Sequence, residues 1–181
     1  MNTTIASERN DHIIAWFAAL AIAIHVLESA IPSPVPGIKI GLANVVTIVV
    51  LVQFGWRTAA WVSILRVLVG SLIIGSFLSP TFVLSLSGAC ASLIAIGLAY
   101  AIARQHLSAL GYSVIAAVAH ILAQFWTAYL LFIPHDALFH LLPILTTVAI
   151  VTGIVNGSLA LAVQKRLKLL MSEAPNVDQQ P

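Results

Sequence analysis

Six long apolar segments constrain this chain more than any other feature of its sequence. Each segment ends where proline, glycine or charged residues interrupt the hydrophobic run, as at residues 32–37 and 79–80. A helix that crosses a bilayer needs about 20 apolar residues, so most of the segments are long enough and only the second is short. The segments are Ile13–Ile31, Ile40–Phe54, Thr58–Phe77, Thr81–Ala103, Tyr112–Ile133 and Leu138–Val163.

The composition places the chain in a membrane. Of its 181 residues, 60% are hydrophobic and only 8% are charged, and the mean hydropathy is +1.04. A soluble domain carries about 25% charged residues, so an ordinary soluble enzyme is excluded, and the hydrophobic content also excludes a disordered chain. Residues 45–52 and 93–103 are apolar on every side, which favours helices over the alternating strands of a barrel. We therefore expect an all-α polytopic membrane protein with a bundle of six transmembrane helices.

The basic residues predict the orientation of this bundle. If the N-terminus is cytoplasmic, six basic residues lie on the inner side and only Lys39 lies on the outer side, as the positive-inside rule requires. The six are Arg9, Arg57, Arg104, Lys165, Arg166 and Lys168. A cleaved signal peptide is disfavoured because the first residues mix acidic and basic side chains. We expect both termini in the cytoplasm and three parts: an N-terminal segment 1–12, a membrane domain 13–165 and a polar tail 166–181.

Polar residues within the spans are the candidate functional residues, because an ionisable side chain there costs at least ~2.5–3.5 kcal/mol on insertion scales. Arg66 follows Arg57 by nine residues, which puts it roughly 13 Å into the membrane at 1.5 Å per residue. Six residues at compatible depths are predicted to line one ligand cavity in the outer half of the bundle: Glu28, Lys39, Asn44, Arg66, His120 and Gln124. This prediction requires the first, second, third and fifth helices to be neighbours.

Structural roles compete with ligand binding for several of these residues. Arg66 and Glu28 would also stabilise the bundle by pairing with each other, and Asn44 would join helices by hydrogen bonding. His25 shares a helix face with Glu28 but is expected to be an interior or interfacial histidine rather than a ligand. His120 and Gln124 are spaced i, i+4, and two large polar groups on one face favour contact with water or a ligand.

Other kinds of site have little support. The sequence has no HxxxH or CxxC motif, and the closest histidine pair, His135 and His140, adjoins a loop, so neither a metal site nor a cofactor is predicted. The sequence also has no P-loop, and its net charge of +2 gives no nucleic-acid footprint. Cys90 is the single cysteine, which excludes an intrachain disulfide.

Small residues predict close helix packing. Ala15, Ala19 and Ala23 form a stripe on the first segment that would let another helix approach closely. Two interpretations of this stripe remain open: packing inside the bundle, and docking onto a separate membrane partner. Four glycines in the third and sixth segments are expected to make contacts inside the bundle: Gly70, Gly75, Gly153 and Gly157.

Several strings in the sequence match a known family. They are ESAIP at 28–32, PGIKIGLAN at 36–44, LRVLVG at 65–70, SLSG at 85–88, and Ala119-His120 with Gln124. Over about residues 13–165 the chain resembles the Gx transporter family, which is also described as heptaprenyl diphosphate synthase component I. Ile121 is a departure, since asparagine is expected after the histidine.

This resemblance implies a fold similar to the substrate-binding S components of energy-coupling factor (ECF) transporters. Such a protein of the bacterial cytoplasmic membrane captures a small solute, such as a vitamin or cofactor precursor, in a pocket that is open to the outside. Its alanine stripe docks on a transmembrane T component driven by two ATPases. Lys39 and Arg66 would attract an anionic or carbonyl group, Asn44, His120 and Gln124 would supply hydrogen bonds, and Glu28 would balance Arg66 or bind an amine.

Two alternatives to this transport function remain. The first is a membrane accessory subunit of polyprenyl diphosphate (isoprenoid or quinone) metabolism. Prenyl synthases need aspartate-rich motifs to hold magnesium and diphosphate, whereas Asp136 is the only aspartate between residues 12 and 177 of this chain. We therefore expect that the chain is not an enzyme by itself. The second alternative is a solitary transporter that works without ATPases.

Overall fold

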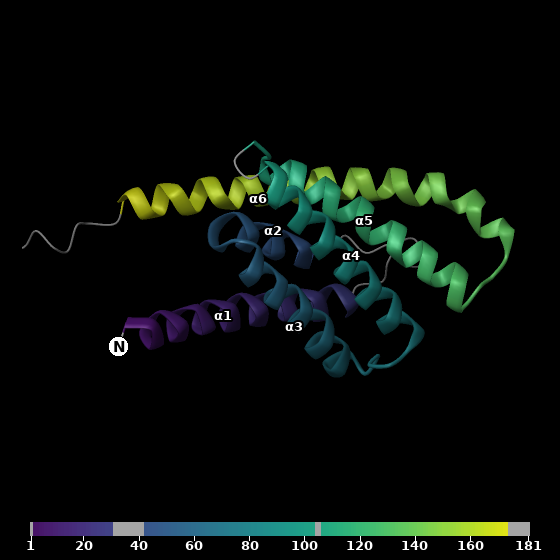
Figure 1. Cartoon of the computed structure of the whole chain (residues 1–181), viewed down its shortest axis with the longest axis horizontal. Helices are drawn as coiled ribbons and strands as arrows, with labels where there is room; N and C mark the ends of the chain where they lie inside the picture. The colour runs from purple at the N-terminus through teal and green to yellow at the C-terminus, as the bar shows by residue number, and fades with distance from the viewer. Residues whose placement is uncertain (1, 31–41, 104–105, 174–181) are drawn as a thin grey trace, which may run out of the picture.

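The computed structural model describes residues 2–30, 42–103 and 106–173, and this part of the chain is almost entirely helical (Figure 1). No strand occurs in these ranges, so the prediction of an all-α protein is confirmed. The elements in chain order are α1 (Asn2–Ala30), α2 (Leu42–Phe54), α3 (Trp56–Ile74), α4 (Pro80–Ala103), α5 (Ala109–Leu131), a 3-10 helix η1 (Asp136–Leu141) and α6 (Leu142–Glu173).

Five of the six predicted spans have helices long and apolar enough to cross a membrane, namely α1, α3, α4, α5 and the run of η1 with α6. The helix of the second segment is too short to cross a membrane. This helix, α2, has 13 residues, which at 1.5 Å per residue extends over about 20 Å of a hydrocarbon core of about 30 Å. The prediction of six spans is therefore confirmed for five. Residues 31–41, where the second segment was expected to begin, lie outside the described residues.

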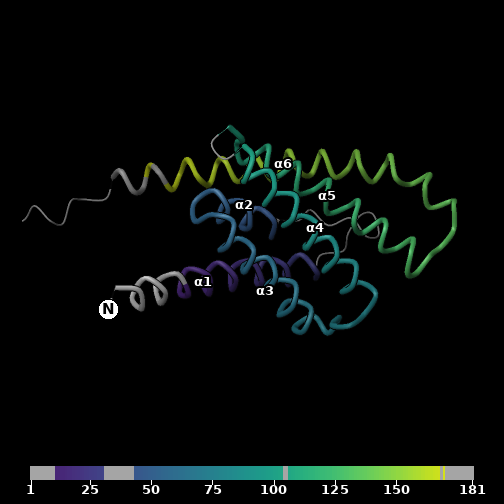
Figure 2. The backbone as a smooth tube through the Cα atoms, viewed as in Figure 1, coloured from purple at the N-terminus to yellow at the C-terminus, as the bar shows by residue number. Residues whose placement is uncertain are grey.

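The short helix α2 lies at the centre of the bundle. It contacts α1, α3, α5 and α6, and every residue from Val46 to Leu51 is buried. In Figure 2, α1 and α6 run along opposite sides of the molecule with α2 between them. A helix enclosed in this way is apolar on all faces, which explains why its sequence shows no amphipathic period.

The start of α1 and the end of α6 lie at the same end of the bundle (Figure 1). The turn between α3 and α4 and the connection between α5 and α6 lie at the opposite end. Both terminal helices extend beyond the predicted spans, since α1 includes residues 2–12 and α6 continues to Glu173. No proline or glycine interrupts either extension, so the polar residues there continue the helix.

Local sequence explains the turn between α3 and α4. Gly75 ends α3 with φ +76°, a left-handed conformation that favours glycine. Ser79 then caps α4, because its Oγ accepts the Phe82 N–H at 3.3 Å. Pro80 is the first residue of α4, where its missing N–H costs no hydrogen bond.

Two glycines bring the backbones of α5 and α6 together, as expected from the sequence. A Cβ on Gly157 would lie 2.6 Å from the Leu110 Cα, and a Cβ on Gly153 would lie 2.9 Å from the Val114 Cα. Gly70 also makes an internal contact, with His25 of α1. The expectation was wrong for Gly75, because a Cβ there would meet nothing within 4 Å.

Candidate functional site

A cavity of about 350 Å³ lies in the half of the bundle away from the chain ends. All six α-helices contribute to it, including the end of α1, the starts of α2, α4 and α6, and the middle of α3 and α5. Five predicted site residues line it: Glu28, Asn44, Arg66, His120 and Gln124. The sixth, Lys39, lies outside the described residues. Five of the six predicted residues therefore line one cavity, and their role in binding a ligand stays a prediction.

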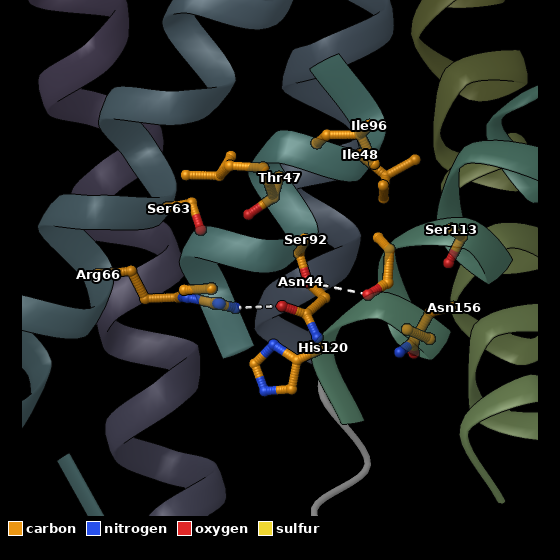
Figure 3. Close-up of a pocket in the computed structure, with 14 residues that line it drawn as sticks. Asn44, Thr47, Ile48, Ser63, Arg66, Ser92, Ile96, Ser113, His120 and Asn156 are labelled. Atoms are coloured by element: carbon orange, nitrogen blue, oxygen red, sulfur yellow. Dashed lines mark hydrogen bonds between the residues drawn. The ribbon is translucent and has the colours of Figure 1, made fainter. Parts of the chain in front are cut away.

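Arg66 is the buried cation of this site. It projects from α3, is only 6% exposed, and donates from Nη1 to Asn44 Oδ1 of α2 at 2.6 Å (Figure 3). A hydrogen bond from a charged donor is stronger than a neutral one, so it fixes the guanidinium against α2. The Nε of Arg66 is buried and has no hydrogen-bond partner within the described residues. Asn44 thus holds Arg66 through Nη1, while the N–H at Nε has no acceptor among the described residues.

Glu28 connects α1 to the same group. Its Oε2 accepts the Ala43 N–H in the first turn of α2 at 3.4 Å. A carboxylate is favourable there because the N-terminal end of a helix carries a partial positive charge. Glu28 also interacts electrostatically with Arg66. The three helices α1, α2 and α3 contact one another and α5 contacts α2, so the neighbour relations that the predicted site requires are present.

His120 of α5 packs directly over Gly88 of α4. A Cβ on Gly88 would lie 2.7 Å from the ring atoms Cε1 and Nε2, so this position accommodates the ring only without a side chain. Figure 3 shows His120 and Arg66 on the same pocket. The close contact with α4 thus sets how far the imidazole reaches into the cavity.

A second, smaller pocket continues from the cavity toward the centre of the bundle (Figure 3). Both spaces are lined by Asn44, Arg66, His120 and Asn156. The small pocket has a volume of about 20 Å³, enough for about one water molecule. Four hydroxyl side chains surround it, from Thr47, Ser63, Ser92 and Ser113, together with the apolar side chains of Ile48, Leu93 and Ile96. The last three are buried in the hydrophobic core, so the polar space ends there.

Comparison with known families identifies the chain. A family model described as heptaprenyl diphosphate synthase component I matches residues 17–163, from α1 to α6. This chain belongs to that family. Searches of curated proteins and of solved structures found no match. The matched region contains all five predicted residues that line the cavity. The comparisons give no support to the expected likeness to S components of ECF transporters.

Sequence reasoning missed some residues of the site. Asn156 of α6 is 4% exposed and lines both spaces, although it is a lone amide inside an apolar segment and the rule that found Asn44 applies to it equally. Thr81, Ser85 and Thr152 also line the cavity. Serine and threonine in a span do not indicate a site in this way, because their hydroxyls can donate a hydrogen bond to a backbone carbonyl of their own helix. Thr152 Oγ1, for example, donates to the Val148 carbonyl at 2.9 Å.

The alanine stripe predicted to dock on a partner does not line the cavity. Ala15, Ala19 and Ala23 are exposed on α1, whereas Ala18 and Ala21 form its buried face. The interpretation that the stripe packs inside the bundle is therefore wrong for the described part of the chain. Within the same ranges no three histidine, cysteine or acidic side chains gather as a metal site would require. His135 and His140 are exposed at η1, away from the cavity.

Proposed function

We propose that this chain is a membrane-embedded, non-catalytic component of a heptaprenyl diphosphate synthase system. The observation that carries the proposal is its family membership over residues 17–163. Magnesium in phosphate chemistry is bound through carboxylates and substrate phosphates, and Asp136 is the only aspartate between residues 12 and 177. That aspartate lies at the exposed helix η1 and accepts from the Tyr129 hydroxyl at 3.3 Å, outside the cavity. We therefore assign prenyl transfer to a partner subunit.

The test is reconstitution of the chain with the catalytic prenyl synthase of the same organism. Both proteins are purified, and product formation from an allylic diphosphate and isopentenyl diphosphate is measured in vesicles with each alone and with both. We expect no product from this chain alone, and a change in rate or product length when it joins the synthase. Product from this chain alone would contradict the non-catalytic role. An unchanged synthase that also fails to co-purify with the chain would contradict the partnership.

A second candidate function, the capture of a small solute, is favoured by the cavity. A buried arginine, a carboxylate, three amides and two histidines converge there from five helices, which is far more polar chemistry than packing needs. We expect that Arg66→Ala abolishes ligand binding while the protein still inserts into the membrane. Arg57→Ala is the matched control, because Arg57 is exposed on the same helix. Wild-type binding by the Arg66 variant would refute the pocket assignment.

We assign contact with a membrane partner to the exposed alanine stripe of α1. Small side chains allow another helix to approach closely, and Ala15, Ala19 and Ala23 stay exposed in the described structure. In the synthase system the partner is a membrane-bound subunit, and in solute uptake it is a T component of an energy-coupling module. Co-purification from native membranes decides between the two.

We also propose that both termini are cytoplasmic and that the cavity faces the outside of a bacterial cytoplasmic membrane. Arg57, Lys165 and Arg166 are exposed at the end of the bundle that holds the chain ends, and basic residues favour the cytoplasmic side. The test uses a Cys90→Ala background with Ser108→Cys or Asp136→Cys. A membrane-impermeant thiol reagent applied to whole cells should label only the second variant; the reverse pattern would refute this orientation.

A further inference from the structure

The full charges of the lining residues that the structure describes cancel. Among the lining residues that the structure describes, Arg66 contributes one positive charge and Glu28 one negative charge. The other polar groups are amides, hydroxyls and imidazoles, from Asn44, Thr81, Ser85, Gln124, Thr152, Asn156, His25 and His120. Because Glu28 interacts electrostatically with Arg66, the site neutralises itself without a ligand.

A self-neutralised cavity in a low-dielectric bundle discriminates against ligands that carry a net charge. A charge taken from water into such a space needs a countercharge, and here each charged group already has one nearby. A diphosphate, with several negative charges, would need several cations or a metal ion, and the described lining residues supply one cation, Arg66. A molecule that is uncharged overall can instead hydrogen-bond to the amides and hydroxyls, and its local charges or dipoles can align with Arg66 and Glu28.

The volume of the cavity also favours a small ligand over a heptaprenyl diphosphate. An engineered cavity of about 150 Å³ holds one benzene ring, and this cavity has about 350 Å³. By proportion it encloses roughly a dozen non-hydrogen atoms or slightly more. A whole heptaprenyl diphosphate is much larger than this. Part of the wall is apolar, from Val67, Leu84, Ile121, Leu145 and Val148, which suits a compact molecule with one apolar side.

We propose that the cavity binds a small, net-neutral polar solute, zwitterionic or uncharged, and not the diphosphate for which the family is named. Arg66, held by Asn44, contacts the electron-rich end of the solute, and Glu28 contacts its electron-poor end. This inference rests on the second candidate function, solute capture, and is independent of the partnership with a synthase.

The experiment is native mass spectrometry of the full chain, purified in a mild detergent and compared with its variants. We expect an adduct below the mass of a lipid, which denaturation releases as a polar molecule without net charge at neutral pH. Isopentenyl diphosphate at millimolar concentration serves as the competing probe and should not displace it. An adduct that is a phosphate ester or a prenyl lipid, displacement by isopentenyl diphosphate, or the absence of any adduct would overturn the inference.

Two variants that each remove one carboxylate make the test specific. Glu28→Gln leaves the cavity with a net positive charge, so the neutral adduct should fall at least tenfold and anionic adducts should replace it. Asp136→Asn is the matched control, because its carboxylate lies outside the cavity, and the adduct should stay as in the wild type. Thermal unfolding of each variant confirms that it is folded. Equal adducts in the wild type and the folded Glu28 variant would refute the role of charge balance. Synthase reconstitution is a separate assay, so either proposal can fail alone.

Discussion

The contact between Gly88 and His120 gives the sharpest test of the packing that holds the site. In Gly88→Ala the new Cβ would lie 2.7 Å from the imidazole, 0.7 Å inside the 3.4 Å at which ordinary contact begins. Three ring atoms lie within 2.8 Å of the new Cβ, so the ring or one of the two helices must shift. Overpacking of this kind costs about 1–3 kcal/mol, partly offset by the roughly 1 kcal/mol that alanine gains over glycine in a helix.

The assay is a double-mutant cycle on the free energy of unfolding in detergent micelles, monitored through the chain's four tryptophans. In the wild-type background we expect Gly88→Ala to lose up to about 2 kcal/mol. In the His120→Ala background the clash partner is absent, so the same change should gain stability by up to about 1 kcal/mol. Gly111→Ala is the control, because its Cβ meets only the flexible end of Leu107. Equal effects of Gly88→Ala in the two backgrounds would refute the argument.

Three further changes test other parts of the structure. Gly157→Ala should lower the free energy of unfolding by about 1–3 kcal/mol, because its Cβ would meet the backbone of α5; wild-type stability would exclude this close packing. Asn44→Ala should cost about 1.5–3 kcal/mol in chemical unfolding, since it removes the acceptor of a buried charged donor, Arg66; an effect near zero would mean that the hydrogen bond is replaced. Ala19→Trp should change stability by less than about 0.5 kcal/mol but reduce co-purification of a membrane partner. Ala101→Trp, exposed on α4, should do neither, and equal partner recovery from both tryptophan variants would refute the docking surface.

The sequence predicted the helices and the polar cluster because each rests on a large energetic penalty. Pro80 starts α4 through a backbone constraint that tertiary packing rarely overrides. A buried charge such as Arg66 in a membrane must find partners, so its depth alone indicated that Glu28 and Asn44 lie nearby. These predictions needed only the depth of each residue in the membrane, from the rise per residue of a helix, and the free-energy cost of a buried charge without a partner.

The role of the alanine stripe stayed open at the sequence level because it depends on which helix face is buried. Ala18 and Ala21 pack inside while Ala15 and Ala19 stay exposed, yet a membrane removes the hydrophobic difference between these faces. An alanine stripe is equally compatible with lipid, with a partner and with the bundle, so its spacing could not decide. The second segment was correctly expected to be short, but it was counted as a span because apolar residues within an enclosed core resemble those of a span.

The short helix also explains why the polar cluster lies where it does. Because α2 contacts four other helices, its first described turn is surrounded by protein, and N–H groups in the first turn of a helix have no acceptor within that helix. Within a membrane those groups must be satisfied by side chains, and Glu28 accepts one of them, from Ala43. The carboxylate in turn offsets Arg66, which Asn44 of the same turn holds in place. Broken or short helices that place a polar terminus in the bilayer are the arrangement by which many membrane proteins build solute sites. The pairing of Glu28 with Arg66 therefore follows from the position of α2. A solute that binds in the cavity must either replace the contacts among Glu28, Arg66 and Asn44 or add its own hydrogen bonds to them.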